Sequence, residues 1–134
     1  MTSLIEWREQ FAIGLPEVDH EHRDLIATIN ALHARLGPAA PAGEVVGALG
    51  DIHSAIAAHF ALEERSMVQL GYPALPAHKA DHERLLDEIL DILDGVAAAQ
   101  DYSPGALSAT LADWFGVHFR SHDVDLHHWL ARRS

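Results

Sequence analysis

The sequence predicts an all-α protein, an up-down-up-down four-helix bundle with an N-terminal arm and a short C-terminal helix. Four long segments repeat apolar residues every three or four positions, which is the period of a helix, and glycine and proline clusters separate them. No segment shows the apolar–polar alternation that favours a strand. A chain of 134 residues can bury one core, so we expect a single domain with the arm at 1–18, the bundle at 19–122 and the tail helix at 123–134.

The first two helices are expected at about residues 19–36 and 44–70. Gly37 and Pro38 should end the first helix, because glycine favours the conformation found just past a helix end and proline cannot continue the helix. Gly71 should end the second helix in the same way. The short loops between helices of this length make neighbouring helices antiparallel.

The third helix is expected at about residues 75–99, and the fourth begins at Ser103 and Pro104. Serine suits the N-cap of a helix and proline suits its first position. The arm that precedes the first helix carries three large apolar side chains that should dock on the bundle: Ile5, Trp7 and Phe11.

The composition excludes several classes of site. A chain without cysteine cannot form a disulfide, a zinc ribbon, an iron–sulfur cluster or a catalytic thiolate. A net charge of −11 disfavours binding to nucleic acid and to anionic membrane surfaces. No apolar run approaches the roughly 18 residues that span a bilayer, and the N-terminus lacks the apolar stretch of a signal peptide. We therefore expect a cytoplasmic protein with no nucleic-acid or membrane partner.

Histidine is the unusual residue of this chain, with 11 histidines against 9 lysines and arginines. His59 and Glu63 lie four positions apart in the second segment, and His78 and His82 do so in the third, so each pair shares one helix face. The apolar faces of the first and fourth segments each carry one further histidine, His22 and His118. An isolated charge in such a core costs several kcal/mol, and a shared cation removes that cost.

A lone buried histidine is more often a hydrogen-bonded core residue than a ligand, but inward histidines on four helices favour a metal site. Spacing does not identify the metal, since imidazole suits zinc, copper, iron and nickel. Five histidines and a carboxylate are too many for one tetrahedral zinc, and they suggest two metals bridged by carboxylates. The Glu-x-x-His motif of ferritin-like bundles occurs only from Glu17 to His20, at a helix edge, so that arrangement fits poorly.

The chain resembles the hemerythrins, and in particular the single-domain bacteriohemerythrins, over nearly its whole length. Five features carry the resemblance: Trp7 with the stretch 14–19 before His22, the motif His59-Phe60-x-x-Glu63-Glu64, Met67 with Tyr72-Pro73, the pair His78-x-x-x-His82, and Trp114 before His118 with Asp123 five residues later.

The resemblance implies two iron ions bridged by an oxo or hydroxo oxygen and by two carboxylates, with dioxygen as the ligand. It assigns His78, His82 and His118 to one iron and His22 and His59 to the other. The two bridging carboxylates would be Glu63 and Asp123. The iron with two histidines would keep an open position for dioxygen.

One ligand conflicts with regular helix geometry. Five residues turn a helix about 140° past alignment, so His122, four residues after His118, is better placed than Asp123. The resemblance nevertheless points to Asp123, and a bridge needs two oxygens, which imidazole lacks. We therefore expect the helix to kink, bulge or end between His118 and Asp123.

A dry apolar pocket is expected beside the open iron position, formed by Leu25, Ile26, Phe60, Trp114, Phe115 and Phe119. The family more often carries smaller aliphatic side chains at the positions of Phe115 and Phe119, so we expect a tighter pocket here. The alternative is that both rings lie in ordinary core between the helices.

The expected function is reversible oxygen binding for storage, delivery or sensing, without catalysis. Imidazoles donate less charge than the four carboxylates of oxidase-type bundles, so the iron pair should be poorer at breaking the O–O bond. The alternatives are a di-iron enzyme that acts on peroxide or nitric oxide, and an iron-storage or signalling module. Azide, nitric oxide or other small ligands could bind the same site, and no downstream partner is indicated.

Six further histidines have no role in the resemblance. We expect His20, His127 and His128 at the surface, and His33 and His53 in the core or beside the site.

Overall fold

The computed structural model describes residues 4–7, 9–11, 16–36, 40–99 and 102–133, and in these ranges the chain is helical without any strand. The elements are a short 3-10 helix η1 (Glu9–Phe11), α1 (Pro16–His33), α2 (Ala42–Leu70), α3 (Leu75–Ala99), α4 (Pro104–His118), the π-helical turn η2 (Phe119–Asp123) and α5 (Val124–Arg133). The predicted all-α class is confirmed.

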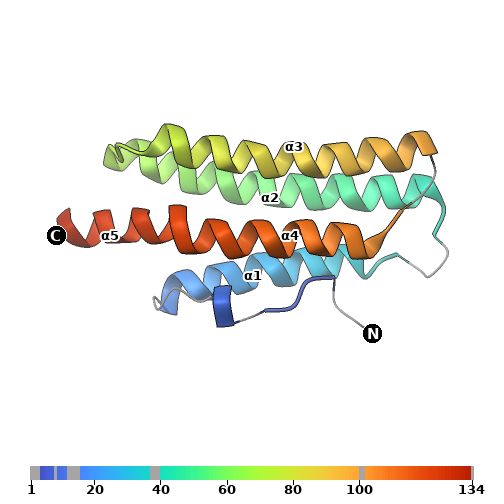
Figure 1. The fold of residues 1–134 in the computed structure, drawn as a ribbon, viewed down its shortest axis with the longest axis horizontal. Helices are drawn as coiled ribbons and strands as arrows, with labels where there is room; N and C mark the ends of the chain where they lie inside the picture. Colours follow the sequence, from blue (N-terminus) through green and yellow to red (C-terminus); the bar gives the residue numbers. More distant parts are fainter. Residues whose placement is uncertain (1–3, 8, 12–15, 37–39, 100–101, 134) are drawn as a thin grey trace.

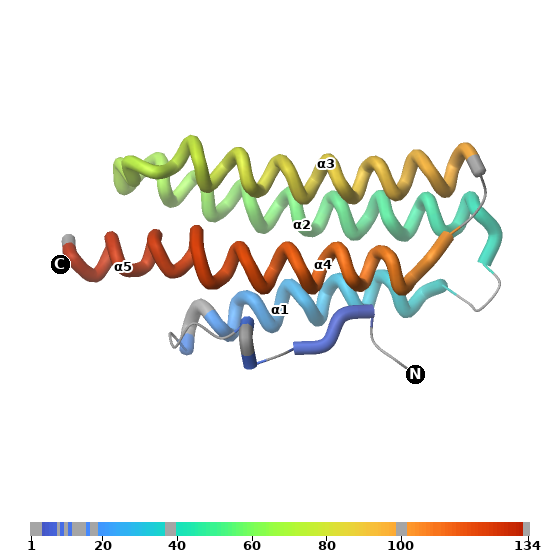
Figure 2. Tube along the Cα trace, viewed as in Figure 1, coloured from blue at the N-terminus to red at the C-terminus, as the bar shows by residue number. Residues whose placement is uncertain are grey.

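The four long helices lie side by side and alternate in direction (Figure 1). Helices α1 and α3 run one way and α2 and α4 run the other, as the colour gradient along the tube shows (Figure 2). Helix α5 continues the line of α4 beyond the π-helical turn and runs past the turn that joins α2 to α3 (Figure 1). The up-down-up-down arrangement is therefore confirmed.

The helix ends follow from local sequence. The hydroxyl of Ser103 accepts a hydrogen bond from the backbone N–H of Ala106, and Pro104 occupies the first turn of α4 as predicted. At the end of α2, Gly71 has a φ of 70°, which side chains other than glycine disfavour. Helix α1 starts and ends three residues earlier than the predicted 19–36, because Pro16 fits a first helical turn.

The N-terminal arm is fixed to α1 by a pair of hydrogen bonds. The backbone N–H of Ile5 donates to Oδ1 of Asn30 (2.9 Å), and Nδ2 of Asn30 donates to the carbonyl of Ile5 (2.7 Å). Ile5 and Phe11 are buried, and the Trp7 ring meets the Phe11 ring edge-on. The predicted docking of the arm is confirmed for these residues, whereas Gly14 and Leu15 of the family motif lie outside the described part of the chain.

Two apolar clusters hold the helices together. The larger one joins the arm, α1, α2, α3, α4 and the π-helical turn along the axis of the bundle. The smaller one consists of Met67, Tyr72 and Leu126, with Trp129 and Leu130 packed against it, and it fixes α5 to the α2–α3 turn. This second cluster therefore fixes the position of the α5 side chains that neighbour Leu126.

Among the described helices, α2 alone contains a window long and apolar enough to cross a membrane by length and composition. The expectation that no segment of this chain is long and apolar enough was therefore wrong for α2, because its many alanines and glycines join the larger apolar residues into one window of few charges. About a third of that window (33%) is buried within the protein, and the buried side chains of α2 are Val45, Ala48, Leu49, Ile52, Ile56, Phe60 and Met67.

Candidate metal centre

Five polar or charged side chains lie in the apolar core with at most 2 % of their surface exposed: His22, His78, His82, His118 and Asp123. They come from α1, α3, α4 and the π-helical turn, and Glu63 reaches the same place from α2. Buried polar groups are stable only when each one has a partner. The contacts among these six residues therefore decide what the site can hold.

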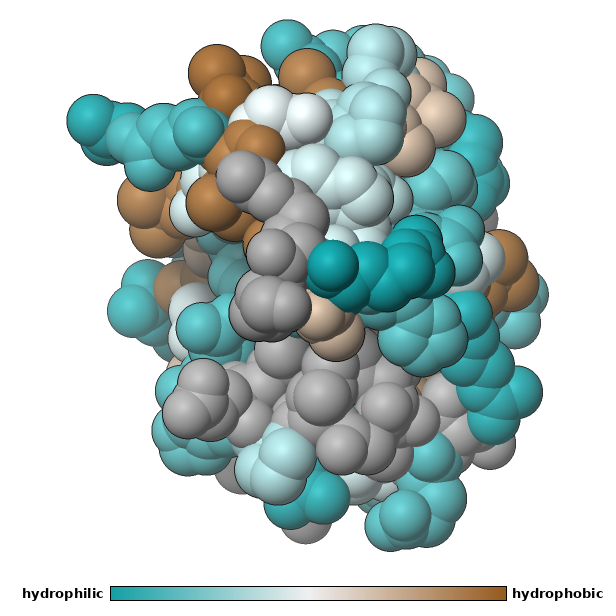
Figure 3. All heavy atoms as spheres, turned by 90° about the vertical axis from the view of Figure 1, so that its left-hand side faces the viewer, coloured by the Kyte–Doolittle hydropathy of each residue, from teal (hydrophilic) through white to brown (hydrophobic). Residues whose placement is uncertain are grey.

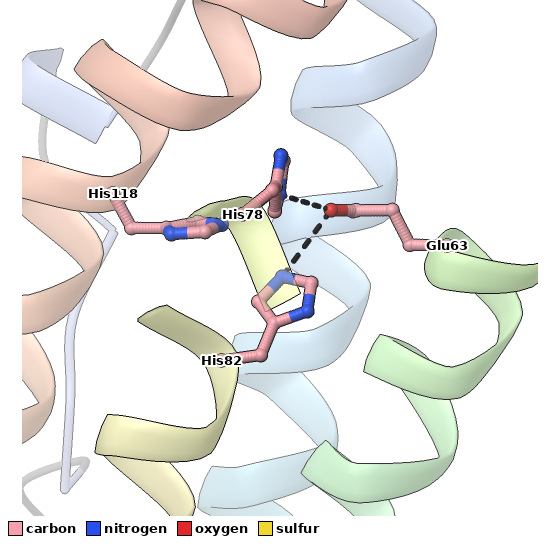
Figure 4. A group of neighbouring side chains, drawn as sticks. All are labelled: Glu63, His78, His82 and His118. Carbon is pink, nitrogen blue, oxygen red and sulfur yellow. Dashed lines mark ion pairs between the residues drawn. The ribbon is translucent and has the colours of Figure 1, made fainter. Parts of the chain in front are cut away.

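Glu63 lies between two histidines of α3. Its Oε1 is 2.7 Å from Nε2 of His78 and 3.3 Å from Nε2 of His82. Figure 4 shows the carboxylate pointing from α2 toward these two rings, with the ring of His118 turned toward the same space. One ligand atom from each of these four residues lies within 4.8 Å of the others, which is close enough for a shared metal ion.

Asp123 contacts histidines on both sides of the site. Its Oδ1 lies 3.1 Å from Nε2 of His78 and 3.2 Å from Nε2 of His118, while its Oδ2 lies 3.1 Å from Nε2 of His22. The two oxygens of one carboxylate thus face two different sets of imidazoles. This is the arrangement of a carboxylate that could bridge two cations.

The π-helical turn places Asp123 in the core. A π-helix closes its hydrogen bonds over five residues instead of four, so His118 and Asp123 point to the same side although they are five positions apart. His122 is 31 % exposed and lies on the Asp81 side of His118, with its Nε2 3.9 Å from Oδ2 of Asp81 and its ring centroid 5.3 Å from that of His118. The expected departure from a regular helix between His118 and Asp123 is confirmed, and of the three forms expected, a kink, a bulge or an end, it is the bulge that occurs.

The buried atoms of the site lack ordinary hydrogen-bond partners. Within the described residues, the unsatisfied atoms include Nε2 of three histidines and one oxygen of each carboxylate, namely those of His78, His82, His118, Glu63 and Asp123. These nitrogen and oxygen atoms lie close to one another, but their directions do not fit hydrogen bonds between them. They face a common space instead. A cation in that space would satisfy all of them, so the donor set fits a metal.

The ionised groups of the site shift one another's pKa values and partly offset one another's charge. Burial alone would raise the pKa of Asp123, but the imidazoles of His118, His22 and His78 hold it well below its ordinary value. Burial alone would lower the pKa of His78, and the neighbouring Asp123 and Glu63 carboxylates instead raise it to about 9. The carboxylates are therefore ionised, and in the absence of a metal a proton on His78 offsets part of their charge.

Glu64 and Asp81, which have no predicted role, orient two of the histidines through the ring nitrogen that faces away from the centre of the site. Nδ1 of His82 donates to Glu64 (2.8 Å), and Nδ1 of His118 donates to Asp81 (2.7 Å). Because a carboxylate only accepts, these bonds place the proton on Nδ1 and leave Nε2 free to bind a metal. The signal in the sequence was their position, since Glu64 follows Glu63 and Asp81 precedes His82.

Asp81 is itself held from two sides. Nε and Nη2 of Arg84 lie 3.2 Å and 3.0 Å from its Oδ1, and the indole N–H of Trp114 donates to its backbone carbonyl. Burial raises the pKa of Asp81, but the His118 and Arg84 partners lower it further, so it stays ionised beside His118.

Three aromatic rings stack on the histidines. Phe60 lies on His82 with ring centroids 3.8 Å apart, Phe119 lies on His22 at 3.7 Å, and Trp114 lies on His118 at 4.2 Å. These rings fix the planes of the imidazoles. Phe60, Trp114 and Phe119 therefore act on the histidines themselves rather than line an open pocket.

A cavity of about 550 Å³ lies beside the site, and its walls come from α1, α2 and α5. His22, His59 and Glu63 line it together with apolar side chains such as Leu62 and Met67. Seen from the end of the bundle that carries α5, hydrophobic side chains gather on one side of the molecule (Figure 3). At the rim of the cavity Leu62 is 66 % exposed, so the cavity meets the surface beside an apolar patch.

The cavity differs from the expected pocket. Of the six residues expected to line it, only Leu25 does so; Ile26 and Phe115 are buried in the core, and the other three are the stacked rings described above. The alternative interpretation of Phe115 as a core residue fits its position against Trp114 and Phe119. The open volume is lined instead by small and aliphatic side chains of α2 and α5.

His59 stands apart from the six converging residues. It lies on the cavity wall, four residues before Glu63, and within the described residues its ring contacts Phe60 (centroids 6.2 Å apart) rather than another imidazole. Burial lowers its pKa, and the nearby Glu63 carboxylate opposes this effect. The structure therefore brings six of the seven predicted ligands into contact and places the seventh beside them.

The remaining histidines differ in how far they are buried. His20 and His128 are exposed as expected, and His33 is half-buried with its Nε2 2.6 Å from the hydroxyl of Tyr102. His53 is partly buried, and its Nε2 has no partner in the described part of the chain. The expectation of a surface position is wrong for His127, which lines the cavity on α5 and is half-buried.

Comparison with known proteins agrees with this site. The model of the hemerythrin HHE cation binding domain matches residues 14–130. A bacteriohemerythrin of Stenotrophomonas maltophilia is 32% identical over 123 residues, which cover 90% of this chain and 78% of that protein. A bacteriohemerythrin of Pseudomonas aeruginosa is 30% identical over 88% of this chain and 76% of its own length, and one of Methylococcus capsulatus is 27% identical over 87% and 88%. The chain therefore belongs to the hemerythrin family of cation-binding domains.

Proposed function

We propose that this protein binds dioxygen reversibly at a pair of iron ions, for oxygen storage, delivery or sensing. The observation that carries the proposal is Asp123, whose two oxygens face His22 on one side and His78 with His118 on the other. One carboxylate between two sets of imidazoles fits two cations better than one. Membership of the hemerythrin family, together with the buried histidine and carboxylate cluster, supports iron as the metal.

The residues would divide between the two ions as the family resemblance implies. His78, His82 and His118 would hold one ion, His22 and His59 would hold the other, and Glu63 and Asp123 would be shared. When bound, two ferrous ions supply the two electrons on which reversible dioxygen binding depends.

The chain itself supplies orientation and exclusion of water. Glu64 and Asp81 keep the protons of two imidazoles on Nδ1, so Nε2 always faces inward. The side of the site formed by His78, His82 and His118 is sealed by Phe60 and Trp114, and these three histidines are at most 1 % exposed. The side formed by His22 and His59 borders the cavity instead, so ligands would reach the site from there.

A second candidate is a di-iron enzyme that acts on peroxide or nitric oxide. The cavity favours it in one respect, since about 550 Å³ is far more than a diatomic ligand fills. The donor set argues for binding, because two carboxylates and five imidazoles make a less electron-rich site than the four carboxylates of the other di-iron bundles.

One experiment separates these functions. The protein is loaded with ferrous iron without oxygen, exposed to air and then returned to an oxygen-free atmosphere, and its visible spectrum is followed through several such cycles. A carrier returns to its starting spectrum after each cycle and holds two irons per chain. Stepwise loss of the ferrous spectrum, or turnover of added peroxide or nitric oxide, would favour the enzyme instead.

A further inference from the structure

The cavity beside the site has one polar residue on α5, His127, which the family resemblance leaves without a role. His127 follows Asp123 by four residues, so both lie on one face of the helix. Helix α5 is fixed there by Leu126, which packs against Met67 and Tyr72, and by Trp129, whose ring meets Tyr72 edge-on at 5.2 Å. The position of the imidazole is therefore set by packing on either side of it.

His127 shares the wall of the cavity with the predicted ligands of one iron. It lines the same space as His22, His59 and Glu63, and it is close enough to Glu63 and Asp123 for their charges to act on it. Burial nevertheless lowers the pKa of His127, which favours the neutral ring at pH 7. A neutral imidazole carries one N–H donor and one acceptor nitrogen.

Among the side chains that line the cavity and are not predicted iron ligands, His127 differs in having a hydrogen-bond donor that no other described residue uses. Two hydroxyls line the cavity, and both already donate to backbone carbonyls of their own helices, Thr28 to Asp24 and Ser66 to Leu62. Glu21 and Asp24 are carboxylates, which only accept. Among the described residues, no hydrogen bond involves the ring of His127. Apart from the predicted iron ligands, it is therefore the side chain whose N–H remains available to a molecule in the cavity.

We propose that His127 donates a hydrogen bond to small ligands bound at the His22 and His59 side of the site, and so sets how strongly the protein holds them. The ligands in question are small molecules with an exposed lone pair, such as dioxygen and azide. This inference rests on the proposed iron site, because the ligand is held between that site and His127.

The cavity explains why such a donor matters. At about 550 Å³ it has room for about 18 water molecules, at roughly 30 Å³ each. A ligand there competes with water rather than filling a tight pocket. A fixed donor gives an anionic ligand such as azide a charge-assisted hydrogen bond, which is stronger than the bond that the same N–H makes to water.

The test uses azide binding to the oxidised, iron-loaded protein, followed by visible absorption. The variants are His127→Leu, which removes the donor, and His127→Gln, which restores one. His128→Leu is the matched control, because it deletes the adjacent histidine, which is exposed and does not line the cavity. We expect azide to bind about tenfold more weakly to His127→Leu, the effect of one hydrogen bond to a charged acceptor. His127→Gln should regain most of this loss, and His128→Leu should match the parent.

A second readout does not depend on iron spectroscopy. Diethyl pyrocarbonate modifies accessible histidines, and tandem mass spectrometry distinguishes His127 from His128. Azide should protect His127 in the loaded protein and leave His128 reactive.

The outcomes separate this inference from the proposed function. If the loaded parent binds azide and His127→Leu binds it equally well, the inference is overturned while the iron site stands. If His127→Leu loses iron, His127 is a metal ligand and the inference is again overturned. If the parent takes up no iron, or iron without any response to azide and dioxygen, the proposed function fails and this inference falls with it.

Discussion

The buried histidines of the site are of two kinds, which differ in whether Nδ1 has a hydrogen-bond partner among the described residues. In His82 and His118, Nδ1 is held by a carboxylate and Nε2 faces the centre. In His22 and His78, Nδ1 is buried without a partner in the described part of the chain. Two of the rings are thus fixed in protonation and direction, and we infer that these two dominate the affinity for the first metal ion.

Asp81 should therefore affect metal affinity without touching the metal. Asp81→Asn keeps an acceptor near Nδ1 of His118 but removes its charge, and we expect iron affinity to fall by about tenfold to a hundredfold. Competition with a chelator of known affinity measures the change. Asp87→Asn makes the same chemical change at an exposed position of α3 and serves as the control. Equal affinities in the two variants would contradict the orienting role.

The contact between His33 and Tyr102 predicts a pH dependence of stability outside the site. Burial lowers the pKa of His33 below its ordinary value of 6.5, and burial raises that of Tyr102 to about 12. A histidine with a lowered pKa in the folded state stabilises the fold above pH 6.5 and loses this contribution as the pH falls. Urea unfolding at pH 7.5 and pH 5.5 should show a smaller loss of stability on acidification for His33→Gln than for the parent. An equal loss in both proteins would show that His33 does not contribute.

At the scale of elements, the π-helical turn decides which side chain of the last helix enters the core. The spacing of the chain makes His122 the better partner of His118 on a regular α-helix, whereas the likeness to hemerythrins and the need for a bridge with two oxygens favoured Asp123. No local sequence signal marks a π-helical turn, because its five residues are compatible with an ordinary helix. The turn persists because burial of Asp123 among three imidazoles outweighs the poorer backbone geometry.

This geometry gives opposite expectations for two neighbouring residues. His122→Ala should keep two irons per chain, because that side chain is partly exposed and, among the described residues, pairs with Asp81 rather than with Glu63 or Asp123. Asp123→Ala should lose at least one iron, because it removes both oxygens that face the imidazoles. Metal analysis of the purified variants decides the question. Loss of iron in His122→Ala with normal iron in Asp123→Ala would reverse the assignment.

At the scale of the whole molecule, much of the fold could be predicted from the sequence because periodicity and helix-ending residues are local signals. The bounds of α3 were predicted to the residue, and those of α2 to within two residues. The directions in which Glu64 and Asp81 point could not be predicted, because they depend on how α2, α3 and α4 cross. The cavity could not be predicted either, because it depends on where α5 packs against the α2–α3 turn.

Removing the metal should destabilise the whole bundle. Without a cation, the core keeps two ionised carboxylates and several unsatisfied ring nitrogens. A ligand present at about a thousand times its Kd stabilises the folded state by about 4 kcal/mol, which raises the Tm of a domain of this size by roughly 10 °C. Calorimetry of the iron-loaded and chelator-treated protein measures the difference, and Asp123→Ala should show a much smaller one. Equal Tm values with and without iron in the parent would argue against a metal that links the four helices.

The separate anchoring of α5 has a consequence for engineering. The wall that carries His127 rests on its own small cluster, whereas the converging histidines rest on the main core. Substitutions along that wall can therefore change the chemistry that an entering molecule meets while the donors behind it keep their places. A library confined to His127 and Leu130, two cavity positions of α5 that leave the buried Leu126 in place, would therefore explore ligand selectivity while the metal-binding core keeps its packing.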